Sequence, residues 1–218
     1  MTSTEVQHCP VKNLKMVLTS LCLLFSFISA EVFAQSKAAR VIILRGTAQV
    51  TTKDGTTTKL KRGDWLPEGS IVKTEAKSFV KLLFIDKSSL NIAPKSSITI
   101  AKFSKKKAGI INLLQGKIRS KVVKDYMNKG EKGKKSKLFI KTKTAAMGVR
   151  GTDFTVGTGV VDTVTVVEGT VTVAQTTSTS FNPSTLDNIL NTKGVPVPQG
   201  TAAKIPKTSA KPITKQVI

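Results

Sequence analysis

The sequence predicts an all-β domain, either a β-solenoid or a β-sandwich, whose short strands turn at glycine corners. Three observations support this class. From residue 40 to residue 174 the chain is a succession of short β-prone runs separated by turn residues. No sustained helical period occurs before the C-terminal tail. A glycine directly precedes a strand of alternating polarity in three places, at residues 45–50, 115–118 and 168–173.

An export signal is expected before this domain. Lys12 and Lys15 form a positive start, and the run from Met16 to Ala30 is apolar. Ala34 offers a small residue for cleavage, so we expect residues 1–34 to be a signal peptide. A retained membrane anchor is the alternative, but the run is shorter than the ~20 apolar residues that span a bilayer. We therefore expect an exported bacterial protein, in the periplasm or at the cell surface, with no retained transmembrane helix.

Cleavage of this segment would limit the chemistry that remains. His8, Cys9 and Cys22 are the only histidine and the only cysteines, and all three lie before the cleavage point. A mature chain without thiol or imidazole excludes Cys and Ser–His nucleophiles, metal sites built on His or Cys, and disulfides. We expect no metal, no cofactor and no catalysis, and a fold held together by its core alone.

The formal net charge of +22 at pH 7 is the strongest compositional feature. Such an excess predicts salt-sensitive attraction to polyanions, such as lipid headgroups or anionic envelope polymers. A solvated surface that only keeps the protein soluble is the alternative. Nucleic acid is not the expected partner, because neither Trp65 nor Tyr126 is interleaved with basic residues as a base-stacking surface requires.

The β-prone runs follow one another closely in the first half of the chain. Asp54-Gly55 lies between two of them and predicts a hairpin turn. The run at 79–85 is nearly all apolar, which predicts a strand covered on both faces. The strands expected in this half lie at residues 41–44, 47–52, 56–60, 70–74, 79–85, 90–93 and 98–103.

Two segments interrupt or follow the domain, which we place at residues 35–175. Residues 126–137 are rich in lysine and glycine and predict a surface loop. The stretch 130–134 lacks the spacing, the preceding strand and the following helix of a phosphate-binding loop. Residues 176–218 are rich in Thr, Ser, Pro and Lys and predict a flexible tail, with a short helix near residues 184–190.

Several spaced motifs resemble the FecR domain. The opening pattern of that family matches residues 63–96, including Gly63-Asp64, Gly69, Asp86 and Pro94-Lys95-Ser96. Its central strand matches 113–118, and its T-P-x-A-x-x-V-R-G-T-x-F-x-V element matches 142–156. Its closing motif matches Glu168-Gly169-Thr170-Val171. The similarity covers about residues 40–174 and keeps the order of every motif, whereas Lys143 stands where the family usually has proline.

The resemblance implies a role in envelope signalling. The best-known FecR proteins carry a cytoplasmic anti-sigma segment, one transmembrane helix and this domain in the periplasm. The few residues before the apolar run here are too short for an anti-sigma module. We therefore expect a stand-alone, exported FecR-like domain that mediates protein interaction in envelope signalling or surface assembly, with an envelope protein as its partner.

The corner at residues 148–152 contains an arginine between two glycines. Arg150 can donate up to five hydrogen bonds, and we expect it to clasp strand-end carbonyls or the carboxylate of Asp153 or Glu168. Contact with a bound anion is the alternative. We expect Thr152 to satisfy the backbone of the turn and Phe154 to face the core. The expected structural motif residues are Gly46, Gly63, Asp64, Gly69, Gly116, Gly148, Arg150, Gly151, Thr152, Glu168 and Gly169.

The candidate binding residues are basic. The period of two in the strand at 117–122 places its three cations on one face and Ile118, Ser120 and Val122 on the other. The carboxylates lie mostly in turns. Asp64 and Glu68 are close enough in sequence to suggest the two carboxylates of a glycosidase, but Gly63 and Pro67 beside them identify them as turn residues. An envelope module that binds anionic polymers or lipid headgroups is thus the alternative to a protein-interaction domain. Its candidate residues are Lys117, Arg119, Lys121, Lys132, Lys134 and Lys135.

Overall fold

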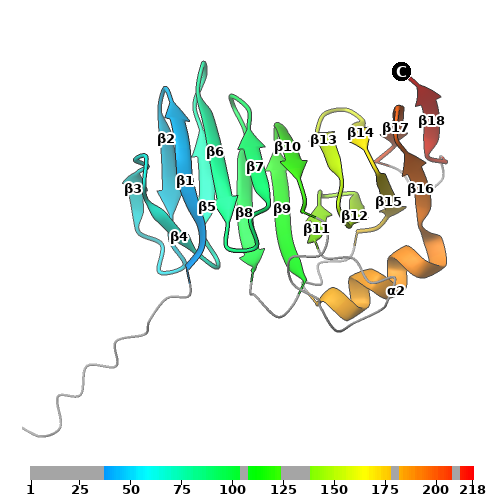
Figure 1. Cartoon of the computed structure of the whole chain (residues 1–218), viewed down its shortest axis with the longest axis horizontal. Coiled ribbons are helices and arrows are strands. Elements are labelled where there is room, and N and C mark those ends of the chain that lie inside the picture. The colour runs from blue at the N-terminus through cyan, green and yellow to red at the C-terminus, as the bar shows by residue number, and fades with distance from the viewer. Residues whose placement is uncertain (1–36, 104–107, 124–137, 178–181, 208–211) are drawn as a thin grey trace, which may run out of the picture. The chain divides into compact units, whose positions relative to one another are not determined.

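Two nine-stranded β-sheets pack face to face in the computed structural model (Figure 1). The model describes residues 37–103, 108–123, 138–177, 182–207 and 212–218. The all-β prediction is confirmed, and neither sheet closes into a barrel. The expected signal peptide at 1–34 and the whole of the expected loop at 126–137 lie outside the described residues.

The first sheet contains, in spatial order, β18 (Thr214–Val217), β17 (Thr201–Ile205), β14 (Asp162–Glu168), β13 (Asp153–Gly157), β10 (Lys117–Lys121), β7 (Ser89–Ile92), β6 (Phe79–Phe84), β1 (Lys37–Arg45) and β4 (Trp65–Pro67). The second contains β16 (Val195–Pro198), β15 (Thr170–Gln175), β12 (Ala145–Val149), β11 (Leu138–Lys141), β9 (Gly109–Gln115), β8 (Ser97–Lys102), β5 (Ile71–Thr74), β2 (Ala48–Thr51) and β3 (Thr57–Lys59).

The chain alternates between the sheets and advances along both of them. From β6 onward the chain mostly forms two consecutive strands in one sheet and then two in the other. Each time it returns to a sheet, its next strand pairs beside the strands that it formed there before. The layers are those of a sandwich, while the steady advance is that of a solenoid. The sandwich and the solenoid, the two architectures between which the sequence did not decide, therefore each describe part of the fold.

One strand breaks the rule of pairs. Among the described residues, β10 is the only strand in the first sheet between β9 and β11. With one strand between them instead of two, β9 and β11 run in the same direction through the second sheet. β11 consequently runs parallel to β9, with Phe139 opposite Ile110, whereas the other pairs of described strands are antiparallel.

The main core fills the space between the sheets with one residue in two from most strands. On the first sheet, Ile118 lies opposite Ile92 on one side and Val156 on the other, and all three are buried. On the second sheet, Val72 and Ile98 form a facing pair. This alternation of buried and exposed residues is the pattern of a sheet with one face in the core.

A second, smaller core lies on the outer face of the second sheet. There α2 (Pro183–Lys193) packs Leu186 and Leu190 against Phe139, Ala146 and Ala174. Because the helix covers this face, every residue of β11 and β12 is buried. The prediction that the strand at 79–85 is covered on both faces is wrong. Buried residues alternate with more exposed ones along β6, and Leu83 is 38% exposed.

The C-terminal segment is ordered where the structure describes it, which corrects the expected flexible tail. β16, β17 and β18 extend the two sheets, and α2 confirms the short helix expected near 184–190. The side chain of Asn182 caps this helix by accepting from the Ser184 amide, and Pro183 occupies its first turn. The prolines proved compatible with pairing because β16 lies at a sheet edge. No helix of the described residues is both long and apolar enough to cross a bilayer.

Glycine in the left-handed conformation forms several of the corners between the sheets. Gly46 and Gly116 have φ values of +74° and +93°; Gly116 directly precedes β10, and Gly46 precedes β2 with Thr47 between them. Each lies against the serine of a neighbouring corner, and the amides of Thr47 and Lys117 donate to Ser78 Oγ and Ser96 Oγ at 2.9 and 3.0 Å. A side chain has no room here, because a Cβ on Gly116 would lie 2.2 Å from Ser96 Oγ.

Gly116→Ala should therefore be strongly destabilising. The alanine would meet the backbone of Ser96 at 2.6 Å and adopt an unfavourable φ. We expect a loss of about 3 kcal/mol in the free energy of unfolding, measured by urea denaturation. Gly55→Ala is the matched control, since Gly55 has a φ of +87° but no atom within 4 Å of the added Cβ. Equal losses for the two variants would contradict the packing argument.

Leu190→Ala should reveal whether the docked helix stabilises the domain. Leu190 is 5% exposed in the second core, so we expect a loss of about 2–3 kcal/mol. Asn191→Ala, at an exposed position of the same helix, should change stability by less than about 0.5 kcal/mol. A Leu190→Ala variant as stable as the wild type would mean that the helix is not docked in solution.

Candidate functional site

The basic strand β10 lies in the middle of the first sheet, between β7 and β13. Lys117, Arg119 and Lys121 are exposed on its outer face, whereas Ile118 and Ser120 are buried. The expected alternation is therefore confirmed. β10 is also paired with a strand on each side, which sets the backbone spacing of the three basic residues along it.

Arg119 is engaged in an ion pair. Its Nε and one terminal nitrogen donate to the two carboxylate oxygens of Asp153 on β13, at 2.8 and 3.0 Å. These hydrogen bonds, together with the charge of Asp153, raise the pKa of Arg119 above its ordinary value. The Asp153 side chain is 11% exposed and that of Arg119 is 50% exposed. The pair partly neutralises the centre of the proposed basic face.

The glycine corner at 148–152 differs in detail from the expected geometry. Gly148 lies inside β12, opposite Phe139 and Thr172, and only Gly151 has a left-handed φ, of +61°. Arg150 is exposed between them. Both carboxylate oxygens of Asp153 accept hydrogen bonds from Arg119, which belongs to β10. A clasp between Arg150 and another group stays a prediction.

The side chain of Thr152 does not make the expected hydrogen bond to the backbone of the turn. Its backbone oxygen accepts from the Val122 amide at 2.8 Å, but its hydroxyl is buried and has no hydrogen-bond partner among the described residues. The methyl group of Thr152 instead packs close to Gly169, the corner that follows Glu168 and precedes β15. Phe154 is fully buried, as predicted.

The remaining motif residues lie at turns near the start of the sandwich. Gly63 and Asp64 precede β4, and the Asp64 carboxylate accepts from the Lys61 amide at 2.7 Å. Gly69 precedes β5 and donates its amide to the Ile100 carbonyl at 2.7 Å. These contacts fix the connections between strands, which is a structural role.

Several carboxylates in the described parts accept hydrogen bonds from nearby backbone or hydroxyl groups. Glu68 accepts from the Phe103 amide at 2.7 Å and Asp162 from the Thr144 hydroxyl at 2.7 Å. Asp86 holds Ser88 through both its amide and its hydroxyl. A hydrogen bond from Thr52, followed by others from Thr56, lowers the pKa of Asp54. No group of three or more acidic, His or Cys residues in the described ranges could hold a metal ion.

One buried cation escaped the sequence analysis. Lys141 ends β11 and is only 4% exposed, and this burial lowers the pKa of its ammonium group. It lies opposite Asn112 on β9, whose side-chain oxygen is buried without a partner among the described residues. An alternating strand pattern would have placed Lys141 in solvent. The remaining candidates, Lys132, Lys134 and Lys135, lie outside the described residues.

The chain shares sequence motifs and fold with known proteins. The family model described as FecR protein matches residues 70–172, which confirms the resemblance seen in the motifs. Two structures of a putative anti-sigma factor from Parabacteroides distasonis ATCC 8503, at 2.50 and 1.65 Å resolution, are similar in fold with a TM-score of 0.50 and 13% identity. In each case the match covers 67% of this chain and 59% of the other.

A third structure, titled cell surface anchoring domain, matches 28% of this chain and 82% of its own at 26% identity, with a TM-score of 0.28. A search among curated proteins finds no match. The shared fold thus extends over more than half of the anti-sigma structures, and the chain spans about three fifths of their length.

The ion pair between Arg119 and Asp153 should contribute measurably to stability. We expect Asp153→Asn to lower the free energy of unfolding by about 1 kcal/mol, because a two-point arginine–carboxylate contact is stronger than an ordinary surface pair. A double-mutant cycle with Arg119→Gln should give a coupling of about 0.5–1 kcal/mol. Lys121→Gln on the same face should stay within about 0.5 kcal/mol of the wild type. Zero coupling would show that the pair is absent in solution.

Proposed function

We propose, from the FecR match over residues 70–172, that this chain is a non-catalytic interaction domain of a bacterial envelope signalling or surface-assembly system. It acts by binding a protein partner along an open strand edge. The fold shared with the putative anti-sigma factor supports a signalling context. The carboxylates whose hydrogen bonds were described are engaged in local structure, which supports a binding role over catalysis.

The observation that carries this proposal is the difference between the two sheet edges at the C-terminal end of the sandwich. β16 forms the edge of the second sheet and contains Pro196 and Pro198. Proline carries no N–H group, so these positions cannot donate to an added strand. Alternating prolines are one of the ways in which proteins close a sheet edge.

The edge of the first sheet is open by comparison. β18 contains no proline, all four of its residues are exposed, and no described strand pairs with its far side. The Ile218 amide donates to the Gly200 carbonyl at 3.0 Å, toward β17. Hydrogen-bonded positions alternate in an antiparallel pair, so Lys215 and Val217 direct their amides away from β17. An extended segment of a partner can pair with these groups.

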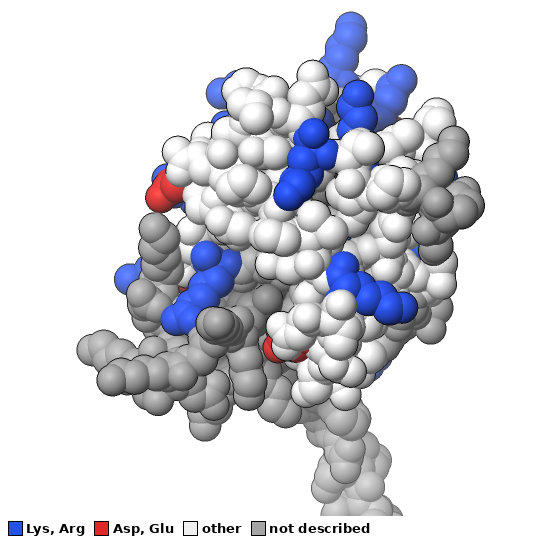
Figure 2. All heavy atoms as spheres, turned by 90° about the vertical axis from the view of Figure 1, so that its right-hand side faces the viewer, with Lys and Arg blue, Asp and Glu red and all other residues white. Residues whose placement is uncertain are grey.

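The charge around this edge favours an acidic partner. Figure 2 shows the end of the sandwich to which β18 belongs, with lysine and arginine side chains spread over it and few acidic ones. Lys204 on β17 and Lys215 on β18 contribute exposed cations. A partner strand with carboxylates would gain attraction as well as backbone hydrogen bonds.

Binding of an anionic polymer or lipid headgroups through the outer face of β10 is the second candidate. It is supported by the exposed row of Lys117, Arg119 and Lys121. The contact between Arg119 and Asp153 weakens it, since one of the three charges already has a partner.

Val217→Pro should abolish partner capture from an envelope extract. The substitution removes an amide that faces the open edge and leaves the Ile218 contact to β17 intact. Val217→Thr is the control, because it changes the side chain but keeps the amide. We expect the full chain and Val217→Thr to retain the same partner at about 0.5 M salt, where contacts between exposed charges are screened. Capture that vanishes at this salt concentration, or that survives in Val217→Pro, would refute edge pairing.

A further inference from the structure

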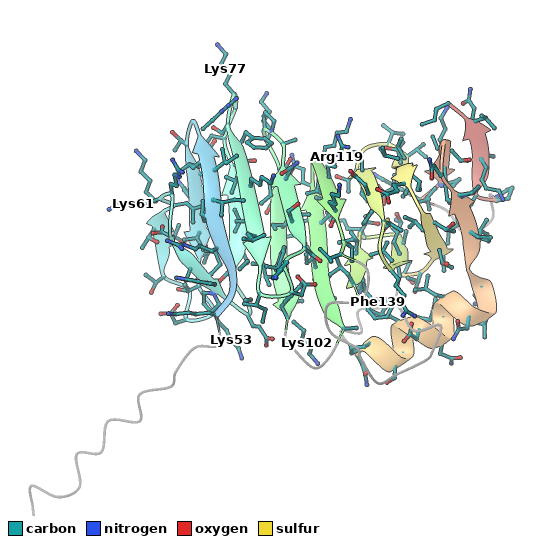
Figure 3. All side chains as sticks on the ribbon, viewed as in Figure 1. Lys53, Lys61, Lys77, Lys102, Arg119 and Phe139 are labelled. Atoms are coloured by element: carbon teal, nitrogen blue, oxygen red, sulfur yellow. The ribbon has the colours of Figure 1, made fainter. Side chains whose placement is uncertain are left out.

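At one end of the sandwich, successive corners of the first sheet each present a cation. The corners belong to β1, β6, β7 and β10, which are neighbours in the sheet. The residues are Arg45, Lys77, Lys95 and Lys117, all of them exposed, and we call this row the corner ridge. Lys77 projects from this end in Figure 3, while Lys53 and Lys102 lie at the opposite end.

The corner ridge is a rigid row, because each corner is hydrogen-bonded to the next. The Thr47 amide donates to Ser78 Oγ at 2.9 Å, and the Lys95 amide donates to the Glu75 carbonyl at 3.2 Å. The Lys117 amide then donates to Ser96 Oγ at 3.0 Å. Strands in a sheet lie about 4.8 Å apart, so the backbone positions of the four basic residues span about 14 Å.

The backbone at two of these corners is unfavourable for the residue that occupies it. Lys77 and Lys95 have left-handed φ values of +56° and +53°, whereas the corners on either side use Gly46 and Gly116. Glycine would adopt this conformation at a lower cost in free energy. Lysine at these two corners therefore carries a conformational cost that glycine would avoid, and backbone strain of this kind is often found at functional sites. Lys87, the other left-handed non-glycine residue described, lies in the hairpin between β6 and β7.

We propose that the corner ridge is a binding site for a linear polyanion, which lies across the ends of β1, β6, β7 and β10. A single row of evenly spaced cations matches a chain of regularly spaced anions better than it matches a compact ligand or a flat membrane. Glu75 is the exposed carboxylate among these corners, so the row is strongly positive. This site is separate from the β18 edge and does not depend on the proposed protein partner.

The test compares two double variants of the full chain that have the same net charge. Lys77→Gln/Lys95→Gln removes two ridge cations, and Lys53→Gln/Lys102→Gln removes two from the opposite end. The probe is an oligogalacturonate of defined length, and binding is measured by calorimetry at low salt. We expect about a 30-fold loss for the ridge variant, since each basic residue facing an anionic surface contributes about a factor of five. The control should stay within about twofold of the wild type, and the ridge variant should show a roughly halved salt dependence.

A second variant guards against loss of the fold. Lys77→Gly/Lys95→Gly suits the left-handed backbone, so its thermal midpoint should equal or exceed that of the wild type while its affinity falls as in the Gln variant. Wild-type affinity in this glycine variant would overturn the proposal. Equal losses in the ridge and control variants would also overturn it, because net charge alone would then explain binding. Tighter, ridge-dependent binding to anionic phospholipid vesicles than to the oligogalacturonate would replace the linear ligand by a membrane.

Discussion

The crossing of the chain from one sheet to the other is the constraint on which the fold depends. Each crossing must reverse the chain within a few residues while it stays packed against the corner beside it. At Gly46 and Gly116 this requires both a left-handed backbone and the absence of a side chain, because a serine of the next corner fills the space. That serine also accepts a hydrogen bond from the amide that directly follows the glycine. The corners therefore fix where each strand begins, and the burial pattern of the strand follows.

The sequence predicted the features that depend on neighbouring residues. Glycines before alternating strands marked the corners, and the period of two in residues 117–121 placed Ile118 in the core. The left-handed corners at Lys77 and Lys95 were not predicted, since lysine has no intrinsic preference for that conformation. Glycine signals such a corner in the sequence, whereas lysine does not.

The features that were missed depend on distant parts of the chain. β12 is buried on both faces because α2, which follows it by more than thirty residues, packs on its outer side. The partner of Asp153 is Arg119, on a strand that precedes it by 34 residues, rather than the nearby Arg150. Ordering of the tail has the same origin, since β16 and β17 are stable only as additions to sheets that already exist. Local composition rich in proline and threonine could not reveal those sheets.

The steady advance of strands along both sheets also bears on how the domain folds. No described strand pairs with one more than five described strands away in the chain, and most pair with a strand at most three away. Each new strand pair therefore closes a loop of only moderate length, and the entropy cost of forming that pair is correspondingly low. A nucleus formed in the middle could grow outward in both directions, as in repeat proteins whose units contact only their neighbours. The same organisation would let such a domain gain or lose a pair of strands at either end during evolution, without rebuilding the pairs between them.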